Sequence, residues 1–126
     1  MKLEEIRAWQ KAKEFSIEVQ RLDFDNSYFQ ENIRKKSLKI PVHIAVGFEK
    51  SAASKEFLAH LKLAQEYCSE TKALIHIASD MHIIEDEDRD KLFEVAEEAT
   101  KLIGGFIKHI KSTIENKHKK QDHDYL

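Results

Sequence analysis

Seven histidines and one cysteine are the residues of this 126-residue sequence whose types could serve metal or nucleophilic chemistry. A di-iron helical bundle needs a Glu-x-x-His pair on two helices and a further Glu from each of the other two. The sequence holds one such pair, Glu115 with His118, near its C-terminal end. His118 and His123 could bind a metal loosely, but a solvated tail is the favoured interpretation. The partners that metal binding needs are absent at ligand spacing from His60, His76, His82 and His109. We therefore expect no metal site and no cofactor.

Cys68 occupies a regular apolar position of a helical repeat, where cysteine packs as a small hydrophobic side chain. A nucleophilic thiol needs a neighbouring base and some exposure to solvent. The sequence also contains no Gly-rich phosphate loop, nucleophile elbow or Cys-x-x-Cys pair. We expect a protein without catalytic residues, and a single cysteine excludes an intrachain disulfide.

Basic residues provide the main candidates for binding, which are Arg34, Lys35, Lys36, Lys39 and Lys50. One stripe of the helix predicted for this region carries Lys36, Lys39, His43 and Lys50. Such a stripe can follow a phosphate backbone, because each contact releases bound counterions. A solvated helix face is the alternative interpretation. Aromatic residues are not interleaved with the stripe, so the sequence does not indicate base stacking.

Charge is distributed unevenly along the chain, although the net charge is only −2. Residues 30–62 carry seven basic and three acidic side chains, a balance of +4. Residues 63–100 carry three basic and eleven acidic side chains, a balance of −8, and residues 101–126 carry six and three, a balance of +3. Opposite charges on separate parts of one domain can steer charged partners or simply keep the protein soluble.

Apolar residues at helical spacing predict four helices, over residues 3–22, 28–48, 54–81 and from 85 or 86 to about 116. The third has a heptad-like seam, typical of helices packed near 20°, formed by Phe57, Leu61, Ala64, Cys68, Thr71, Ile75 and Ala78. The expected fold is all-α, an antiparallel up-and-down four-helix bundle. It forms one domain over residues 1–116, and residues 117–126 form a polar, disordered tail.

Pro41 interrupts the pattern of the second helix. It removes the hydrogen bond to the Ser37 carbonyl and disfavours a helical Ile40. We expect a kinked helix or two abutting helices. Gly47 and the serines that follow it predict the next turn.

The fourth helix is apolar over more than one stripe, because Phe93, Val95, Leu102, Ile107 and Ile114 widen its seam. A face of this breadth favours a second interface and self-association. Gly104 and Gly105 lie within this helix, where either the close approach of another backbone or simple tolerance could explain them. No apolar run is long enough to span a membrane and no N-terminal signal is visible, so a cytoplasmic protein is expected.

Several segments have a pattern in common with one known family, and they are Trp9-Gln10-Lys11-Ala12, Arg34-Lys35, Ile40-Pro41-Val42-His43-Ile44-Ala45-Val46-Gly47-Phe48, Ser54-Lys55-Glu56-Phe57 and Glu70. Together they resemble the four-helix bundle proteins encoded in intervening sequences of bacterial 23S rRNA genes. The accessory variability determinants of diversity-generating retroelements belong to the same broader group. The resemblance covers about residues 3–115.

The resemblance implies a non-enzymatic protein whose bundles associate as a homopentameric ring. Retroelement members bind nucleic acid and a reverse transcriptase through basic surfaces, so the resemblance makes RNA, DNA and a reverse transcriptase candidate partners. The positions that match such a surface are Arg34, Lys35 and Lys36, and Lys39 is added by this sequence.

The sequence also departs from the family's usual Ser-Ile-Pro-Ala-Asn-Ile-Ala-Glu-Gly motif. Lys39, His43 and Val46 replace its Ser, Asn and Glu, and Glu66-Tyr67 replaces a Gly-Ser pair on the third helix. The bundle should tolerate these changes, but His43 and Val46 cannot perform a role that needs the polar Asn and Glu.

Two functional hypotheses remain. The first is an oligomeric scaffold that binds nucleic acid through the basic second helix. The alternative is a protein–protein interaction module without nucleic-acid binding, which would use the broad fourth helix and the acidic residues of 63–100.

Overall fold

The computed structural model of the protein describes the backbone of residues 1–51 and 54–124 and the side chains as far as His118. A short 3-10 helix, η1 (Leu3–Glu5), precedes four α-helices, which are α1 (Arg7–Arg21), α2 (Ser27–Lys50), α3 (Lys55–Asp80) and α4 (Asp86–Asp124). The described residues contain no strand. The prediction of an all-α chain with four helices is therefore confirmed.

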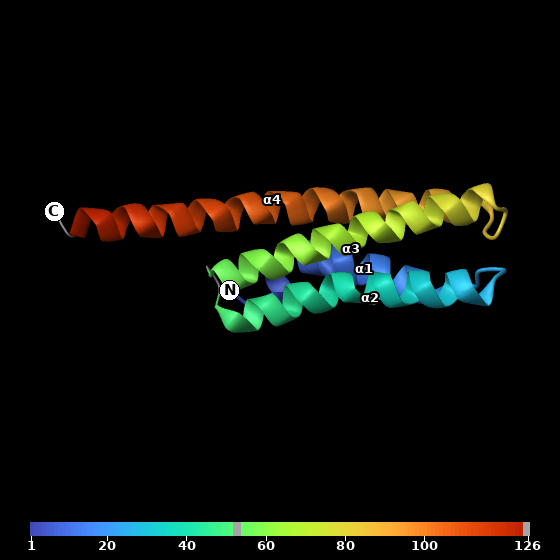
Figure 1. Cartoon of the computed structure of the whole chain (residues 1–126), viewed down its shortest axis with the longest axis horizontal. Coiled ribbons are helices and arrows are strands. Elements are labelled where there is room, and N and C mark those ends of the chain that lie inside the picture. Colours follow the sequence, from blue (N-terminus) through green and yellow to red (C-terminus); the bar gives the residue numbers. More distant parts are fainter. Residues whose placement is uncertain (52–53, 125–126) are drawn as a thin grey trace.

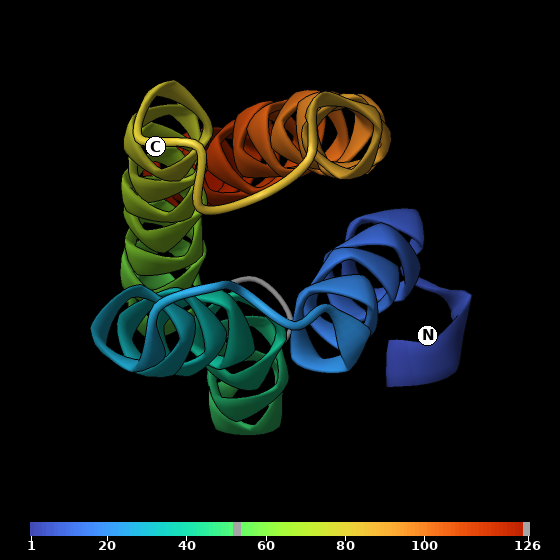
Figure 2. The same cartoon turned by 90° about the vertical axis from the view of Figure 1, so that its right-hand side faces the viewer.

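The four helices form an antiparallel bundle in which neighbours in sequence are neighbours in space. Successive helices run in opposite directions along the long axis of the molecule (Figure 1). Viewed end-on, they surround a common core in chain order, and α4 closes the bundle by packing on α1 (Figure 2). This is the predicted up-and-down topology, which short connections between helices favour.

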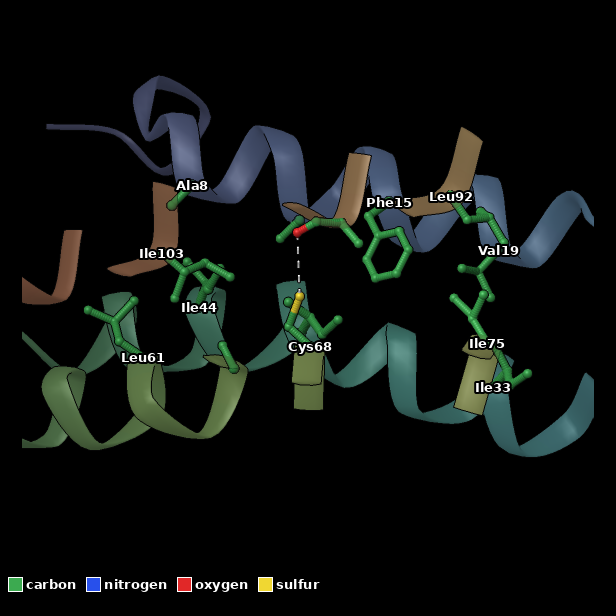
Figure 3. Packing of buried hydrophobic residues seen from close by; sticks show 14 of the residues in the cluster. Ala8, Phe15, Val19, Ile33, Ile44, Leu61, Cys68, Ile75, Leu92 and Ile103 are labelled. Atoms are coloured by element: carbon green, nitrogen blue, oxygen red, sulfur yellow. Dashed lines mark hydrogen bonds between the residues drawn. The ribbon is translucent and has the colours of Figure 1, made fainter. Parts of the chain in front are cut away.

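The core consists of aliphatic and aromatic side chains from all four helices (Figure 3). All seven predicted seam positions of α3 are buried. Phe15 of α1, Ile33 of α2 and Ile103 of α4 are completely buried opposite this seam. The sequence periodicity therefore identified the buried face of α3 correctly.

Helix α2 is continuous from Ser27 to Lys50 and passes through Pro41 without a break. The alternative of two abutting helices is therefore wrong, and a kink at Pro41 is not confirmed. Ile40 and Ile44 are both completely buried on either side of the proline. Their packing holds both halves of the helix against the core, which offsets the hydrogen bond that proline cannot donate.

The ends of α2 and α3 are fixed by local hydrogen bonds. The Asn26 side chain accepts a hydrogen bond from the Phe29 amide at 3.0 Å, and the Ser54 hydroxyl accepts one from the Phe57 amide at 3.1 Å. Ser54 is thus the N-cap that the sequence predicted. At the other end of α3, His82 adopts a left-handed conformation with φ of 59°. The Ile83 amide then donates to the Ala78 carbonyl at 2.8 Å, which is the Schellman pattern of a helix C-terminus.

Helix α4 extends to Asp124, past the end predicted near residue 116, and its last turns project beyond the other helices (Figure 1). Part of the predicted tail therefore has a helical backbone, because residues 106–124 contain no glycine or proline to end the helix. None of the helices in the described residues is long and apolar enough to cross a membrane.

The broad apolar face of α4 is used within the molecule. Phe93, Val95, Leu102 and Ile114 are partly buried against the core, and Ile107 is buried in it. The width of α4 is thus explained by a single chain and does not by itself require a second interface. Among the described residues, no backbone atom outside the adjoining turns of α4 lies within 4 Å of a Cβ placed on Gly104 or Gly105, so close approach of another segment of this chain does not explain these glycines.

Candidate binding surface on helices α2 and α3

Arg34 differs from the other predicted binding residues because it holds two parts of the bundle together. Its guanidinium donates a hydrogen bond to the Leu22 carbonyl at 2.9 Å and lies 3.4 Å from an Asp23 carboxylate oxygen. The carbonyl belongs to the C-cap residue of α1, where helices leave acceptors unsatisfied. Arg34 therefore joins α1 to α2 and is not part of the exposed lysine stripe.

Lys36 and Lys39 lie on the side of α2 that faces α3. The Lys36 ammonium lies 3.4 Å from the Glu70 carboxylate, and the Lys39 ammonium lies 5.9 Å from the centre of the Tyr67 ring. Lys35 and Lys50 are exposed, and neither forms an ion pair within the described residues. The structure thus brings Lys36 and Lys39 to one surface with groups of α3, while Lys50 lies further along the same stripe.

His43, on the same stripe, makes two contacts with α3. Its ring stacks on Tyr67 with 5.5 Å between ring centres and an interplanar angle of 7°. Its Nδ1 atom lies 3.0 Å from Nδ1 of His60, and these two ring centres are 5.2 Å apart. The two ring centres are further apart than the two Nδ1 atoms by almost two ring radii. Each Nδ1 atom therefore lies between the centre of its own ring and the other ring. This is the geometry of an N–H···N hydrogen bond between two imidazole rings, with the donor set by their tautomers.

Gly47 makes the contact between the two histidines possible. A Cβ at this position would lie 2.7 Å from the His60 Cβ and 2.9 Å from Cδ1 of Phe57. Both distances are far below ordinary contact, so only glycine lets α3 approach α2 this closely. The sequence predicted that Gly47 marks a turn, but it lies inside α2 and serves packing instead.

The environment lowers the pKa of His43. Partial burial disfavours the imidazolium, and electrostatic repulsion from the neighbouring His60 ring, when protonated, and from Lys39 adds to this effect. The lowered pKa favours the neutral form of His43 at pH 7, in which its Nδ1 can take part in the hydrogen bond with His60. Protonation of both rings would replace the hydrogen bond with repulsion between α2 and α3.

We use the name α2–α3 surface for the group formed by Lys36, Lys39, His43, Lys50, His60, Tyr67 and Glu70. The sequence indicated no aromatic residue on the lysine stripe, but Tyr67 of α3 lies beside Lys39 and His43. The pattern of α2 alone does not reveal this contact, because Tyr67 is distant in sequence. One signal was present in the sequence, because Lys39, His43 and Tyr67 all lie where the chain differs from the motifs that carry the resemblance, and the fold brings them together.

Other residues considered for chemistry lie apart from this surface. Cys68 is buried, its sulfur lies 3.2 Å from the Thr100 hydroxyl, and burial raises the pKa of the thiol. A thiol in this state is a poor nucleophile. Glu115 and His118 are exposed on the projecting part of α4. Within the described residues, no group of three or more His, Cys, Asp or Glu side chains could hold a metal ion.

The fold and this surface define the class: an antiparallel four-helix bundle with a basic and aromatic face on two adjacent helices. Residues 4–105 match the family described as 23S rRNA-intervening sequence protein, and this match covers most of the chain. The chain belongs to this family, which confirms the resemblance seen in the sequence. No curated protein matches the chain. The family description gives the genetic location of the coding sequence and states no activity.

Proposed function

We propose that the protein is a non-enzymatic oligomeric scaffold that binds nucleic acid through the α2–α3 surface. The observation that carries the proposal is the row formed by Lys36, Lys39 and Lys50, with Tyr67 beside its centre. Lys36 and Lys50 are separated by 14 residues of helix, which corresponds to about 21 Å. A row of this length can contact several successive phosphates of one strand.

The structure also limits how strong this binding can be. Arg34 is engaged with the Leu22 carbonyl, and the charge of Lys36 is partly neutralised by Glu70. Lys39 and Lys50 are then the main cations of this surface available for phosphates, and Lys36 adds a partly neutralised one. With about two to three contacts per protomer, the logarithm of the binding constant should fall with the logarithm of salt concentration with a slope of about −1.5 to −2.5.

Further parts of the proposal rest on the family. The resemblance implies a ring of five protomers, which would present five copies of the α2–α3 surface and raise the apparent affinity. It also implies a reverse transcriptase as a protein partner. A cytoplasmic location completes the proposal and agrees with the single cysteine.

Fluorescence anisotropy with labelled single-stranded RNA, single-stranded DNA and duplex DNA tests the proposal across a salt series. We expect binding at low salt, and we expect the double variant Lys39→Glu/Lys50→Glu to lose it. The matched control is Lys101→Glu/Lys108→Glu, which changes the net charge equally at exposed positions of α4. Absence of binding at low salt, or an equal loss in the control, contradicts nucleic-acid binding at this surface.

The exposed apolar side chains of α2 favour the alternative function, a protein–protein interaction module without nucleic-acid binding. Leu38, Val42 and Val46 are large hydrophobic residues that remain exposed on this helix. Partners recovered on the wild-type protein after nuclease treatment, together with no anisotropy change on any nucleic acid, would support this alternative.

A further inference from the structure

A ridge of aliphatic side chains runs along the outer face of α2. Leu38, Val42 and Val46 follow each other at spacings of four residues, and 46%, 51% and 37% of their surfaces are exposed. Residues four apart form the ridges through which helices pack on one another. Contiguous apolar rows on a protein surface mark interaction sites more often than scattered apolar residues do. The ridge is therefore suited to contact with another helix.

The residues that flank the ridge carry opposite charges at symmetric positions. Lys35 lies three residues before Leu38, and Glu49 lies three residues after Val46. Both side chains are exposed, and neither takes part in an ion pair in the described residues. The five positions thus have spacings of three, four, four and three, which read the same in both directions from Val42.

This symmetry makes the ridge complementary to itself when two copies of α2 lie antiparallel. With Val42 opposite Val42 of a second copy, Leu38 faces Val46 of that copy. Lys35 then faces Glu49 of the second copy at both ends of the contact. A parallel arrangement would instead place Lys35 opposite Lys35 and Glu49 opposite Glu49, and like charges would oppose it. Charge therefore selects both the orientation and the register.

We propose that the outer ridge of α2, formed by Lys35, Leu38, Val42, Val46 and Glu49, binds the same ridge of a second copy of this chain in an antiparallel, two-fold contact. Such a contact is isologous, whereas the contacts that close a ring of five are heterologous. The inference adds a second kind of contact to the self-association proposed above. It uses the outer face of α2, so Lys36, Lys39 and Lys50 stay on the side toward α3.

The test measures mass in solution by sedimentation over a range of protein concentrations. Val42→Asp places two carboxylates at the centre of the contact, and we expect it to halve the mass. Ile17→Asp is the matched control, because Ile17 is an exposed aliphatic residue of α1 with 40% of its surface accessible. Circular dichroism melts of both variants check that each one is still folded, so that a lower mass of Val42→Asp reports the loss of the contact and not unfolding.

Charge exchange provides a stricter test of the register. Lys35→Glu alone and Glu49→Lys alone each place like charges opposite one another, and each should weaken the contact more than about tenfold. An equimolar mixture of the two single variants pairs glutamate with lysine at both ends, so the mixture should associate as the wild type does. The double variant Lys35→Glu/Glu49→Lys should also associate with itself.

The outcomes separate this inference from the proposed function. A wild-type mass that falls by half in Val42→Asp and is restored in the mixture supports the two-fold contact, whether the remaining unit is a monomer or a ring of five. A mass unchanged by Val42→Asp, or a mixture that fails to associate, overturns the two-fold contact. Nucleic-acid binding by the mass-halved Val42→Asp variant would show that the two proposals stand independently.

Discussion

Replacement of Gly47 by alanine should destabilise the protein, although alanine is the better helix former. The new methyl group would lie 2.7 Å from the His60 Cβ and 2.9 Å from a ring carbon of Phe57, which is almost fully buried. Neither atom belongs to the flexible end of a side chain, so α2 and α3 must move apart. Overpacking of this kind costs about 2–3 kcal/mol, and the higher helix propensity of alanine returns about 1 kcal/mol.

The net loss of about 1–2 kcal/mol should appear as a melting temperature lower by about 4–8 °C. Urea denaturation followed by circular dichroism measures the free energy of unfolding directly. Gly105→Ala is the matched control, because a Cβ at Gly105 meets no atom within 4 Å among the described residues. It should raise stability by about 0.5–1 kcal/mol. Equal effects of the two substitutions would refute the explanation given for Gly47.

Three further predictions concern other elements. His82→Gly should raise the free energy of unfolding, measured by urea denaturation, by about 0.5–1 kcal/mol, because His82 has a φ of 59° that glycine adopts more readily. A lower free energy of unfolding would contradict this account. Folding lowers the pKa of His43, so as the pH decreases the unfolded chain binds a proton at this side chain before the folded chain does. The free energy of unfolding should therefore fall as pH decreases from about 7 through the unfolded-state pKa of about 6.5. His43→Asn should flatten this part of the stability–pH profile measured from urea midpoints, and an unchanged profile would argue against a lowered pKa of His43 in the folded protein. Arg34→Lys should lower the free energy of unfolding by about 1 kcal/mol, because the hydrogen bond to the Leu22 carbonyl is lost, but it should leave nucleic-acid affinity unchanged. A large loss of affinity measured by fluorescence anisotropy would show that Arg34 does contact nucleic acid.

Local pattern was sufficient for the helices and for their buried faces. The spacing of apolar residues located α3 within one residue at each end, and Ser54 was recognised as its N-cap. These features depend on backbone geometry over a few residues, which the sequence encodes directly. The same reasoning failed at Pro41, where a break in α2 was allowed, because burial of Ile40 and Ile44 decides whether the helix continues.

The candidate surface was only partly predictable. Lysines on one stripe of α2 were visible from their spacing, and the family resemblance was carried by the same segment. Tyr67 and His60 joined them only through the packing of α3 on α2. Arg34 was included among the candidate binding residues because its type fits phosphate binding, but the end of α1 lies within reach of its guanidinium.

The sequence by itself determined that this chain is a helical bundle of the 23S rRNA-intervening sequence protein family, because helical periodicity and family motifs are local properties. The tertiary structure decided which side chains are free to act. In the folded chain the broad apolar face of α4 is covered by the core, and Arg34 is hydrogen-bonded to the end of α1. The side chains that remain exposed on α2 are Leu38, Val42 and Val46. It also brought His43 against His60 across Gly47. Contacts between residues far apart in sequence depend on how helices approach one another, and that distance is set by packing of the whole core.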